Sequence, residues 1–324
     1  MIKVGIVGYG NLGRGVTLAV NAASDMECVG IFTRRNPKDL TPAVDFPVYS
    51  VDNLDRFVGK IDVLLLCGGS ATDLPENTVK MLEKFNTVDS FDTHAKIPEY
   101  FSKLEKVAKA NGTLAAISIG WDPGVFSIAR MLFGAVLPNG NDYTFWGKGV
   151  SQGHSDAIRR IDGVKNAIQY TIPKEEALNA VRSGKNPNLT TREKHLRECF
   201  VAIEDGADKN LIEQTIKQMP NYFADYDTIV NFVSEEEVKK MQQKLAHGGF
   251  VFRSGSTTDQ NAHLLELSLK LDSNPEFTGS VLTAYGRAVA RLSKEGKTGV
   301  VTVFDVPIKY LSPLSEEELR AHLL

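Results

Sequence analysis

Three glycines close to the start of the sequence, Gly8, Gly10 and Gly13, have the spacing G-x-G-x-x-G. The apolar residues 2–7 before them predict a buried strand, and residues 12–23 after them carry apolar side chains at helical spacing. In such a turn the first glycine allows the bend, the second admits a pyrophosphate, and the third packs the helix on the strand. The free N–H groups of the helix N-terminus also favour phosphate. We therefore predict a dinucleotide site, the alternative being a glycine-rich turn without a ligand.

Two adjacent arginines follow the second predicted strand, residues 27–32. At this point an NAD site has an acidic residue for the ribose 2′-hydroxyl, whereas an arginine accommodates the 2′-phosphate of NADP. Thr33, Arg34 and Arg35 occupy the position, and no Asp or Glu does. A guanidinium group is always charged and meets phosphate oxygens in a fork. We predict NADP(H) as the cofactor; a solvated basic turn is the alternative, and the sequence does not rank the two arginines.

Two carboxylates end predicted strands of the same region: Asp92 ends residues 87–92, and Asp122 lies near the end of residues 113–124. A carboxylate there can hold a substrate ammonium group, or take its proton as an amine becomes an imine. Each has a plainer interpretation, because Asp92 could cap the following helix and Asp122 before a proline is a common turn former. Their occurrence at neighbouring strand ends favours the chemical role.

The only two tryptophans, Trp121 and Trp146, adjoin glycine-rich segments where they could form pocket walls, although large aromatics usually lie in the core. Gln152 and Gly153 could present an amide and a backbone N–H to a carboxylate, or belong to an ordinary loop.

Three further residues are weaker candidates. Thr171 ends a predicted strand, and Arg197 lies in residues 190–204, which we expect to be a helix on which an arginine is usually solvated. His247 could interact with the C-terminus of a helix predicted over residues 234–248. Cys67 is expected to be a small packing residue beside the cofactor. The cysteines and histidines lack metal-ligand spacing, so we predict no metal.

The elements that position these residues form two domains. Residues 1–120 alternate between continuous apolar strands and helices, which predicts a Rossmann-like, doubly wound parallel sheet. Ligands of such α/β sheets bind beyond the carboxyl ends of the strands. Residues 121–275 alternate apolar and polar side chains in a way typical of antiparallel strands, with helices between, which predicts an α+β substrate and dimerisation domain. Residues 276–324 form a return segment whose helix, residues 279–295, is expected to pack on the first domain.

The chain has 324 residues, 42% hydrophobic and 24% charged, with a net charge of −3, which is typical of a globular protein. The mild acidity argues against general nucleic-acid binding, and no apolar run has membrane-spanning length. The first residues already predict a strand and phosphate loop, which leaves no place for a signal peptide, and the odd, low cysteine count fits a reducing compartment. We expect a cytoplasmic protein.

Taken in order, these segments resemble the meso-diaminopimelate D-dehydrogenase family over essentially the whole chain. The most specific are GYGNLGRG, FTRR, SFDTH, SIGWDPGVFS, FWGKGVSQGHSDAIR, REKHLRECFV, AHGGFV and LDSNPEFT. The resemblance implies reversible NADP-dependent oxidative deamination of meso-2,6-diaminopimelate at its D-carbon. The products are L-2-amino-6-oxopimelate, which cyclises to tetrahydrodipicolinate, ammonia and NADPH, in lysine biosynthesis. It also implies a homodimer formed through the second domain.

The resemblance assigns roles residue by residue. It places the reacting amine at Asp92 and Asp122, and the rest of the substrate at Trp146, Gln152, Gly153, Thr171, Arg197, His247 and Asn274. It places NADP(H) at Gly8, Gly10, Asn11, Leu12, Gly13, Arg14, Thr33, Arg34, Arg35, Cys67, Gly68, Gly69, Ser70, Ser90, Phe91, Asp92, Ile119, Gly120, Trp121, Asp122 and Pro123.

The sequence fits two other functions less well. Another two-domain NADP oxidoreductase, such as a sugar dehydrogenase, would carry Glu-Lys-Pro where this chain has Phe91-Asp92-Thr93. A non-catalytic NADP sensor is disfavoured by the many polar residues at strand ends and in second-domain loops.

Overall fold

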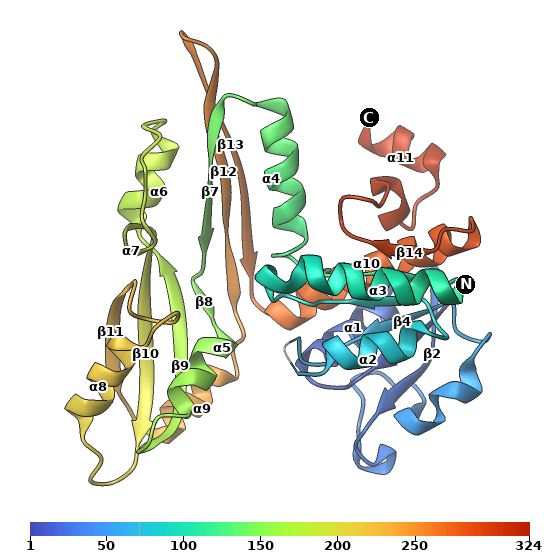
Figure 1. Cartoon of the computed structure of the whole chain (residues 1–324), viewed down its shortest axis with the longest axis horizontal. Coiled ribbons are helices and arrows are strands. Elements are labelled where there is room, and N and C mark those ends of the chain that lie inside the picture. The colour runs from blue at the N-terminus through green and yellow to red at the C-terminus, as the bar shows by residue number, and fades with distance from the viewer. Residues whose placement is uncertain (71) are drawn as a thin grey trace. The chain divides into compact units, whose positions relative to one another are not determined.

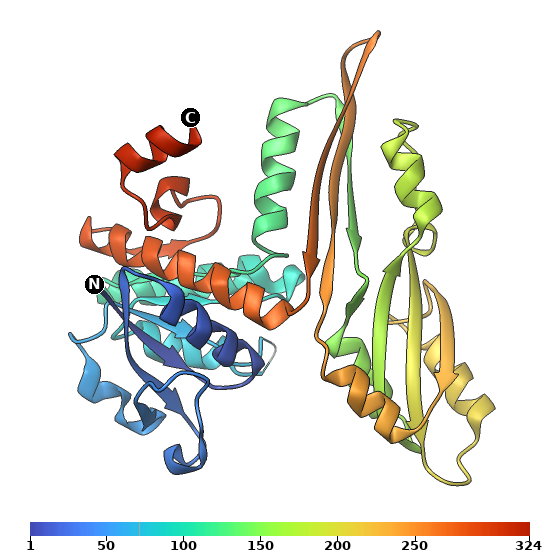
Figure 2. The same ribbon diagram turned by 180° about the vertical axis from the view of Figure 1, so that it is seen from behind.

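The computed structural model describes residues 1–70 and 72–324 and divides into two compact units. The first comprises residues 1–128 and 275–324, and the second comprises residues 129–274. Figures 1 and 2 show the elements of each unit from opposite sides.

The first unit is built on a seven-stranded sheet in the order β14-β6-β5-β4-β1-β2-β3, with every neighbouring pair parallel. This confirms the predicted Rossmann-like, doubly wound sheet. From β1 the chain adds β2 and β3 on one side of it and then returns to add β4, β5 and β6 on its other side. The strand order therefore reverses next to β1, and ligands of such sheets bind at this switch point. The strands are β1 (Ile2–Val7), β2 (Met26–Thr33), β3 (Val48–Ser50), β4 (Val63–Leu66), β5 (Thr87–Asp89), β6 (Leu114–Ala116) and β14 (Gly299–Val301).

Helices cover both faces of this sheet (Figures 1 and 2). One core joins alternate strand residues such as Val4 to Val16 of α1 and Leu282 of α10, and the other joins Leu64 to Leu82 of α2 and Leu104 of α3. Because successive side chains of a strand point to opposite faces, a parallel sheet buried on both sides needs apolar residues at nearly every position. The covering helices are α1 (Asn11–Ala22), α2 (Leu74–Leu82), α3 (Ile97–Asn111) and α10 (Asn274–Lys294). Two further helices are α4 (Val125–Val136), which leads into the second unit, and α11 (Glu316–Leu323) near the C-terminus.

Two boundaries in this unit differ from the sequence-based expectation. Strands β5 and β6 end at Asp89 and Ala116, earlier than expected, so Asp92 and Asp122 lie in the loops that follow. Helix α10 begins at Asn274 rather than near residue 279, because Pro275 occupies its first turn, where a proline costs no helical hydrogen bond.

The second unit contains two sheets. One has the order β11-β10-β9-β8 and the other the order β13-β12-β7. All pairs are antiparallel except β10 with β11, which are parallel because helix α8 forms the crossover between them. The elements are β7 (Gly140–Trp146), β8 (Gly149–Val150), α5 (Gln152–Arg159), β9 (Val164–Pro173), α6 (Glu175–Arg182), α7 (Thr191–Lys194), β10 (His195–Ile203), α8 (Lys209–Gln218), β11 (Asp227–Phe232), α9 (Glu235–Gln242), β12 (His247–Thr258) and β13 (Asn261–Leu271).

The helix expected over residues 190–204 was wrong. Only α7 is helical, and β10 follows it directly, with alternate residues from His195 to Cys199 buried and the residues between them less so. That period of two is the strand signal, which the charged residues of the segment obscured. Helix α9 likewise ends at Gln242, so His247 opens β12 and does not lie at the C-terminus of a helix.

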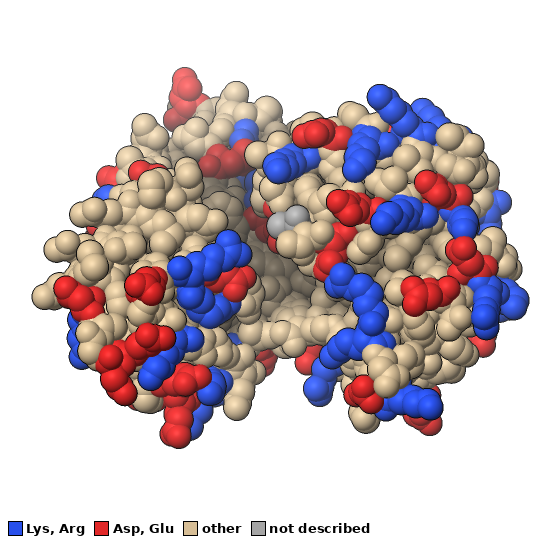
Figure 3. Space-filling model, turned by 60° about the horizontal axis from the view of Figure 1, so that its bottom comes forward, with Lys and Arg blue, Asp and Glu red and all other residues tan. Residues whose placement is uncertain are grey.

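Charged side chains of both signs are interspersed over the face that Figure 3 shows, without an extended field of one sign.

In the described part of the chain, no helix combines the length and apolar character that a membrane crossing requires.

Within the first unit, an ion pair ties helix α10 to the residue that precedes β2. The guanidinium of Arg287, 5% exposed, donates to both carboxylate oxygens of Asp25 at 2.7 and 2.8 Å and to the carbonyl of Leu311 at 2.8 Å. These bonds hold the pKa of Asp25 below its usual range. The fork therefore joins the loop before β2 to the long helix.

We expect Asp25→Asn to lower the free energy of unfolding by about 1–3 kcal/mol, because it leaves the buried guanidinium of Arg287 without its anion. The loss is at the lower end for a buried ion pair because the carboxylate of Asp25 is partly exposed to water. Because the folded-state pKa of Asp25 is depressed, its contribution exists above the ordinary value of 3.8 and is lost as the pH falls through the lower folded value. Thermal unfolding at pH 7 measures the loss. Asp55→Asn, which removes the exposed partner of Lys84, is the control and should change stability little.

Candidate active site

The glycine-rich turn after β1 has the geometry that phosphate binding requires. Gly8 has a φ of +91° and donates its N–H to the carbonyl of Phe32 at 2.8 Å. A Cβ on Gly13 would lie 2.3 Å from the Gly8 oxygen, whereas a Cβ on Gly10 would meet no atom within 4 Å. Packing inside the chain thus requires glycine at residue 13 but not at residue 10, as expected if Gly10 serves the approach of a ligand.

Helix α1 begins directly after this turn. Its N-cap is Gly10, which has no side chain to bond the first amides, and its first turn contains no acidic residue. The N-terminus therefore keeps its partial positive charge and its unpaired N–H groups for an anion.

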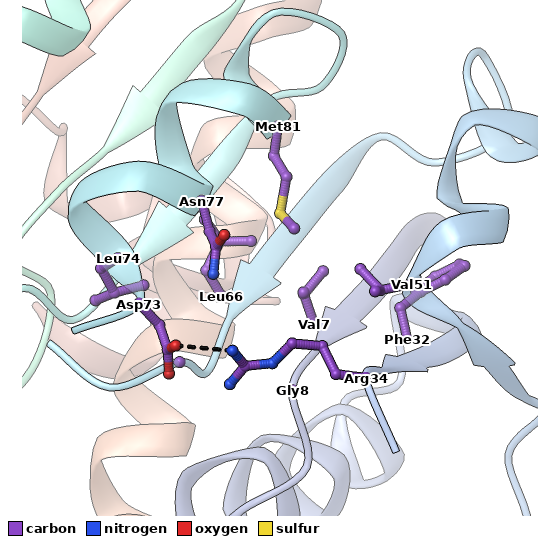
Figure 4. Close-up of a pocket in the computed structure, with 11 residues that line it drawn as sticks. Val7, Gly8, Phe32, Arg34, Val51, Leu66, Asp73, Leu74, Asn77 and Met81 are labelled. Atoms are coloured by element: carbon purple, nitrogen blue, oxygen red, sulfur yellow. Dashed lines mark ion pairs between the residues drawn. The ribbon is translucent and has the colours of Figure 1, made fainter. Parts of the chain in front are cut away.

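A pocket lies beyond the ends of β1, β2 and β4, at the switch point of the sheet (Figure 4). Val7, Phe32, Leu66, Val51 and Met81 line its apolar part, and Arg34, Asp73 and Asn77 are its polar side chains. This combination suits a flat apolar base bearing a few polar groups, with a cation nearby for an attached phosphate.

The two arginines after β2 have different partners. Arg34, whose side chain is 72% exposed, pairs with Asp73 at 3.0 Å (Figure 4), and Asp73 also accepts the N–H of Gly69 at 2.9 Å. Arg35 donates from its guanidinium to the carbonyl of Tyr9. Arg34 is therefore tied to the turn after β4, and Arg35 to the turn after β1.

The loops after β4 and β5 are joined at Asp92. Its N–H donates to the hydroxyl of Ser70 at 2.9 Å, and its side chain is exposed. Asp92 occupies no N-cap position, because Thr93 precedes the short turn at residues 94–96 and Lys96 precedes α3. The capping interpretation of Asp92 was therefore wrong.

The neighbouring loop, after β6, carries Trp121 and Asp122. Trp121 is 8% exposed and packs edge-to-face on Phe126, with ring centroids 5.2 Å apart. Because β5 and β6 are adjacent and parallel, Asp92 and Asp122 follow neighbouring carboxyl ends of one sheet edge. Cys67, which follows β4, is buried and is a poor nucleophile, because burial raises the pKa of its thiol.

In the second unit, Arg197 and Thr171 face each other on β10 and β9, and the guanidinium donates to the threonine hydroxyl. Arg197 is 7% exposed, and its guanidinium carbon lies 3.9 Å from the centre of the Tyr226 ring. Within residues 1–70 and 72–324 no carboxylate forms an ion pair with it, and its Nε has no hydrogen-bond partner.

Burial lowers the pKa of Arg197, which reflects the cost of removing the cation from water. Buried charges are normally paired. A buried guanidinium whose only described partners are a hydroxyl and an aromatic ring is able to accept an anionic ligand, and the geometry of a carboxylate matches its two parallel N–H donors.

The remaining candidates of this unit occupy three places. Gln152 and Gly153 are exposed in the first turn of α5, whose early N–H groups are the unpaired ones of a helix. Trp146 donates its main-chain N–H to Nε2 of His195 at 2.9 Å, and its indole stacks on that imidazole. His247 packs so closely on Gly149 that a Cβ there would lie 2.2 Å from the imidazole.

Asn274 donates its N–H to the carbonyl of Leu245 at 2.8 Å. No group of three potential metal ligands occurs among the described residues.

Sequence reasoning missed Tyr226, Asp73 and the buried Asp89. An aspartate in the middle of the strand predicted over residues 87–92 was a signal for Asp89, since a buried carboxylate needs several donors. Nothing in the sequence distinguished Tyr226 or Asp73, because their importance lies in contacts with residues distant along the chain.

Comparison with known proteins is consistent with this geometry. Residues 120–273 match a family described as the diaminopimelic acid dehydrogenase C-terminal domain. The meso-diaminopimelate D-dehydrogenase of Ureibacillus thermosphaericus is 58% identical over 100% of this chain and 99% of its own. A substituted meso-DAPDH from Clostridium tetani E88, solved with DAP, has a TM-score of 0.95 and 51% identity, with 100% of both chains covered. An engineered D-amino acid dehydrogenase bound to NADP⁺ has a TM-score of 0.87 and 43% identity, covering 100% of this chain and 99% of that one.

Proposed function

The chain belongs to the meso-diaminopimelate D-dehydrogenase family, and we propose how its own residues carry out that family's reaction. The enzyme oxidises the D-carbon of meso-2,6-diaminopimelate with NADP⁺ and water, releasing ammonia, NADPH and L-2-amino-6-oxopimelate, in lysine biosynthesis. The resemblance read from the sequence is thereby confirmed, and the rival sugar dehydrogenase and sensor functions are not supported. The observation that carries the assignment of residues is the buried guanidinium of Arg197, which forms no ion pair with any carboxylate of the described residues, because the substrate bears a carboxylate at its distant end.

We assign the cofactor to the first unit. The N-terminus of α1 and the Gly8–Gly13 turn would hold its pyrophosphate, and the pocket beyond β1, β2 and β4 its adenine. Arg34 and Arg35 would bind the 2′-phosphate. Arg34 would then interact with both the phosphate and the carboxylate of Asp73. The loops after β4, β5 and β6 complete the set, at residues 67–70, 90–92 and 119–123. When bound, the nicotinamide supplies the hydride acceptor.

Replacing Arg34 and Arg35 with alanine should weaken NADP⁺ binding by about 30- to 1000-fold, since charged hydrogen bonds contribute roughly 1.5–3 kcal/mol each before exposure is discounted. Binding of NAD⁺, which lacks the 2′-phosphate, should be nearly unchanged. Titration of each cofactor followed by intrinsic fluorescence measures both constants. Lys38→Ala with Lys106→Ala removes two exposed charges from the same unit and serves as the control. Equal losses for NADP⁺ and NAD⁺ in the double-arginine variant would contradict the assignment.

We assign the distant, L-configured end of the substrate to the second unit. The two ends of a meso compound differ only in hand, so an enzyme that acts on the D-carbon must fix the other end. Arg197 would grip the far carboxylate, with its ring partner Tyr226 setting the plane of the guanidinium. Thr171 and His247, and the amides at Gln152 and Gly153, would add donors, while Trp146 and Asn274 would line the pocket.

Arg197→Met keeps the apolar stem and removes the charge. It should raise KM for meso-diaminopimelate strongly and also lower kcat, because binding at a remote group is used to position the reacting carbon. A simple apolar D-amino acid has no second carboxylate and should lose far less. The ratio of kcat/KM for the two substrates is the measurement, and Arg160→Met, at an exposed arginine of the same unit, is the control. If both substrates lose activity by the same factor, Arg197 supports the fold and does not bind the far end.

We assign the reacting amine to Asp92 and Asp122. The amine must lose a proton as the C=N bond forms, and a water molecule must then add to the imine and release ammonia. Carboxylates beside the amine can attract the substrate ammonium and exchange these protons. The exposed side chain of Asp92 and its position beside the Asp122 loop support this role.

Asp122→Asn keeps the shape and removes the basic group. It should lower kcat by about 10²- to 10⁴-fold, the usual contribution of general acid–base catalysis, while NADP⁺ affinity changes little. The rate is read from NADPH absorbance with saturating meso-diaminopimelate. Near-normal turnover would return Asp122 to a turn-forming role.

Two further properties are proposed on the resemblance alone: assembly as a homodimer through the second unit, and a cytoplasmic location. Light scattering on the purified chain tests the first.

A further inference from the structure

The carboxylate of Asp89, at the end of β5, has an unusually complete set of donors. Asp89 is fully buried. Its Oδ1 accepts the N–H of Phe91 at 3.0 Å and the N–H of Ser118 at 3.2 Å. Its Oδ2 accepts the hydroxyls of Tyr100 at 2.7 Å and Thr78 at 3.4 Å. One oxygen therefore binds two loop amides, and the other is fixed to helices α3 and α2.

The two amides belong to the loops that carry the proposed catalytic carboxylates. Phe91 immediately precedes Asp92, and Ser118 begins the segment that leads to Asp122. The main-chain carbonyl of Asp89 adds a third link by accepting the N–H of Ile119 at 2.9 Å. A single residue thus joins both loops to the framework of the sheet and its helices.

The backbone of Ser118 shows why such a link is needed. Its φ of +58° lies in the left-handed region, which a non-glycine residue rarely adopts without support. The serine hydroxyl is buried and has no partner in the described chain, so the side chain does not supply that support. The bonds to Asp89 from Ser118 and from the next amide do.

Burial raises the pKa of the Asp89 carboxyl, and the four donors oppose that effect. A full set of donors is what a buried carboxylate requires, whereas a residue needed only for packing would be apolar here, as Val88 and Phe91 are.

We propose that Asp89 is a positioning residue for the dehydrogenase reaction. It holds the loops that carry Asp92 and Asp122 in a fixed position at the reacting end of the substrate. The proposal rests on the assignment of the amine to those two carboxylates. In this role Asp89 does not need to contact the substrate, because the residue is buried and acts through the two loops.

Asp89→Ala should lower kcat by about 30- to 300-fold. Tyr100→Phe is the matched control, because it removes a donor from Oδ2 of the same carboxylate but leaves both loop amides bound through Oδ1. It should lower the melting temperature yet keep kcat within about threefold. Asp89→Asn retains an oxygen for the loop amides and should recover most of the kcat lost in the alanine variant. If Tyr100→Phe loses as much kcat as Asp89→Ala, the residue serves stability alone and the proposal fails.

A double-mutant cycle with Asp122→Asn, and another with Asp92→Asn, distinguishes positioning from general stabilisation. If Asp89 acts through these carboxylates, Asp89→Ala should cost much less kcat in a background that already lacks one of them. If the losses multiply in both backgrounds, the positioning role is wrong.

Near-normal kcat in both single asparagine variants would instead overturn the proposed function at the amine. Should Asp89→Ala not fold, Asp89→Asn is used in the same cycles, with a smaller expected loss of about 3- to 10-fold in the intact background.

Discussion

Parallel strand pairing is the constraint on which the proposed catalytic machinery depends. In the first unit every strand runs in the same direction, so the carboxyl ends of β1, β2, β4, β5 and β6 all meet one edge of the sheet. The loops at that edge contain the glycine turn, the arginine pair and both proposed catalytic carboxylates. The fold thereby brings together segments that are separated by more than a hundred residues in the sequence.

The second unit contains a buried charge for which the described residues supply no counterion. Ion pairs elsewhere, such as Arg287 with Asp25, satisfy a buried guanidinium inside the chain. Arg197 is equally buried but meets only a hydroxyl and an aromatic ring among the described residues. The fold therefore bears a desolvation cost that a bound carboxylate could offset, and in the proposed site this would favour a ligand with an anionic end.

Asp89 represents the complementary case, a buried anion whose partners are all internal. Its donors come from two loops and two helices, so one carboxylate links these four elements. Loops that carry reactive groups are otherwise among the more mobile parts of a protein. Tying them to one buried carboxylate limits that mobility where proton transfer requires defined distances.

The sequence by itself determined the features that depend on local order. These features are properties of short segments. The glycine spacing predicted the turn after the first strand, the apolar runs predicted the strands of the first unit, and Arg34 and Arg35 in place of an acidic residue predicted the cofactor. The order of such segments along the chain also identified the family.

Prediction from local sequence failed where contacts with residues distant in the sequence decide the secondary structure or the burial of a side chain. A helix was expected over residues 190–204, but pairing with β9 and β11 makes residues 195–203 a strand, and this places Arg197 inside the sheet rather than in solvent. Only the tertiary structure revealed that Arg197 lies on Tyr226, that Asp73 shares Arg34, and that Asp89 binds amides from two loops. Burial and hydrogen bonding arise from the packing of the whole unit, and a carboxylate or guanidinium has the same letter in the sequence whether it is solvated or buried.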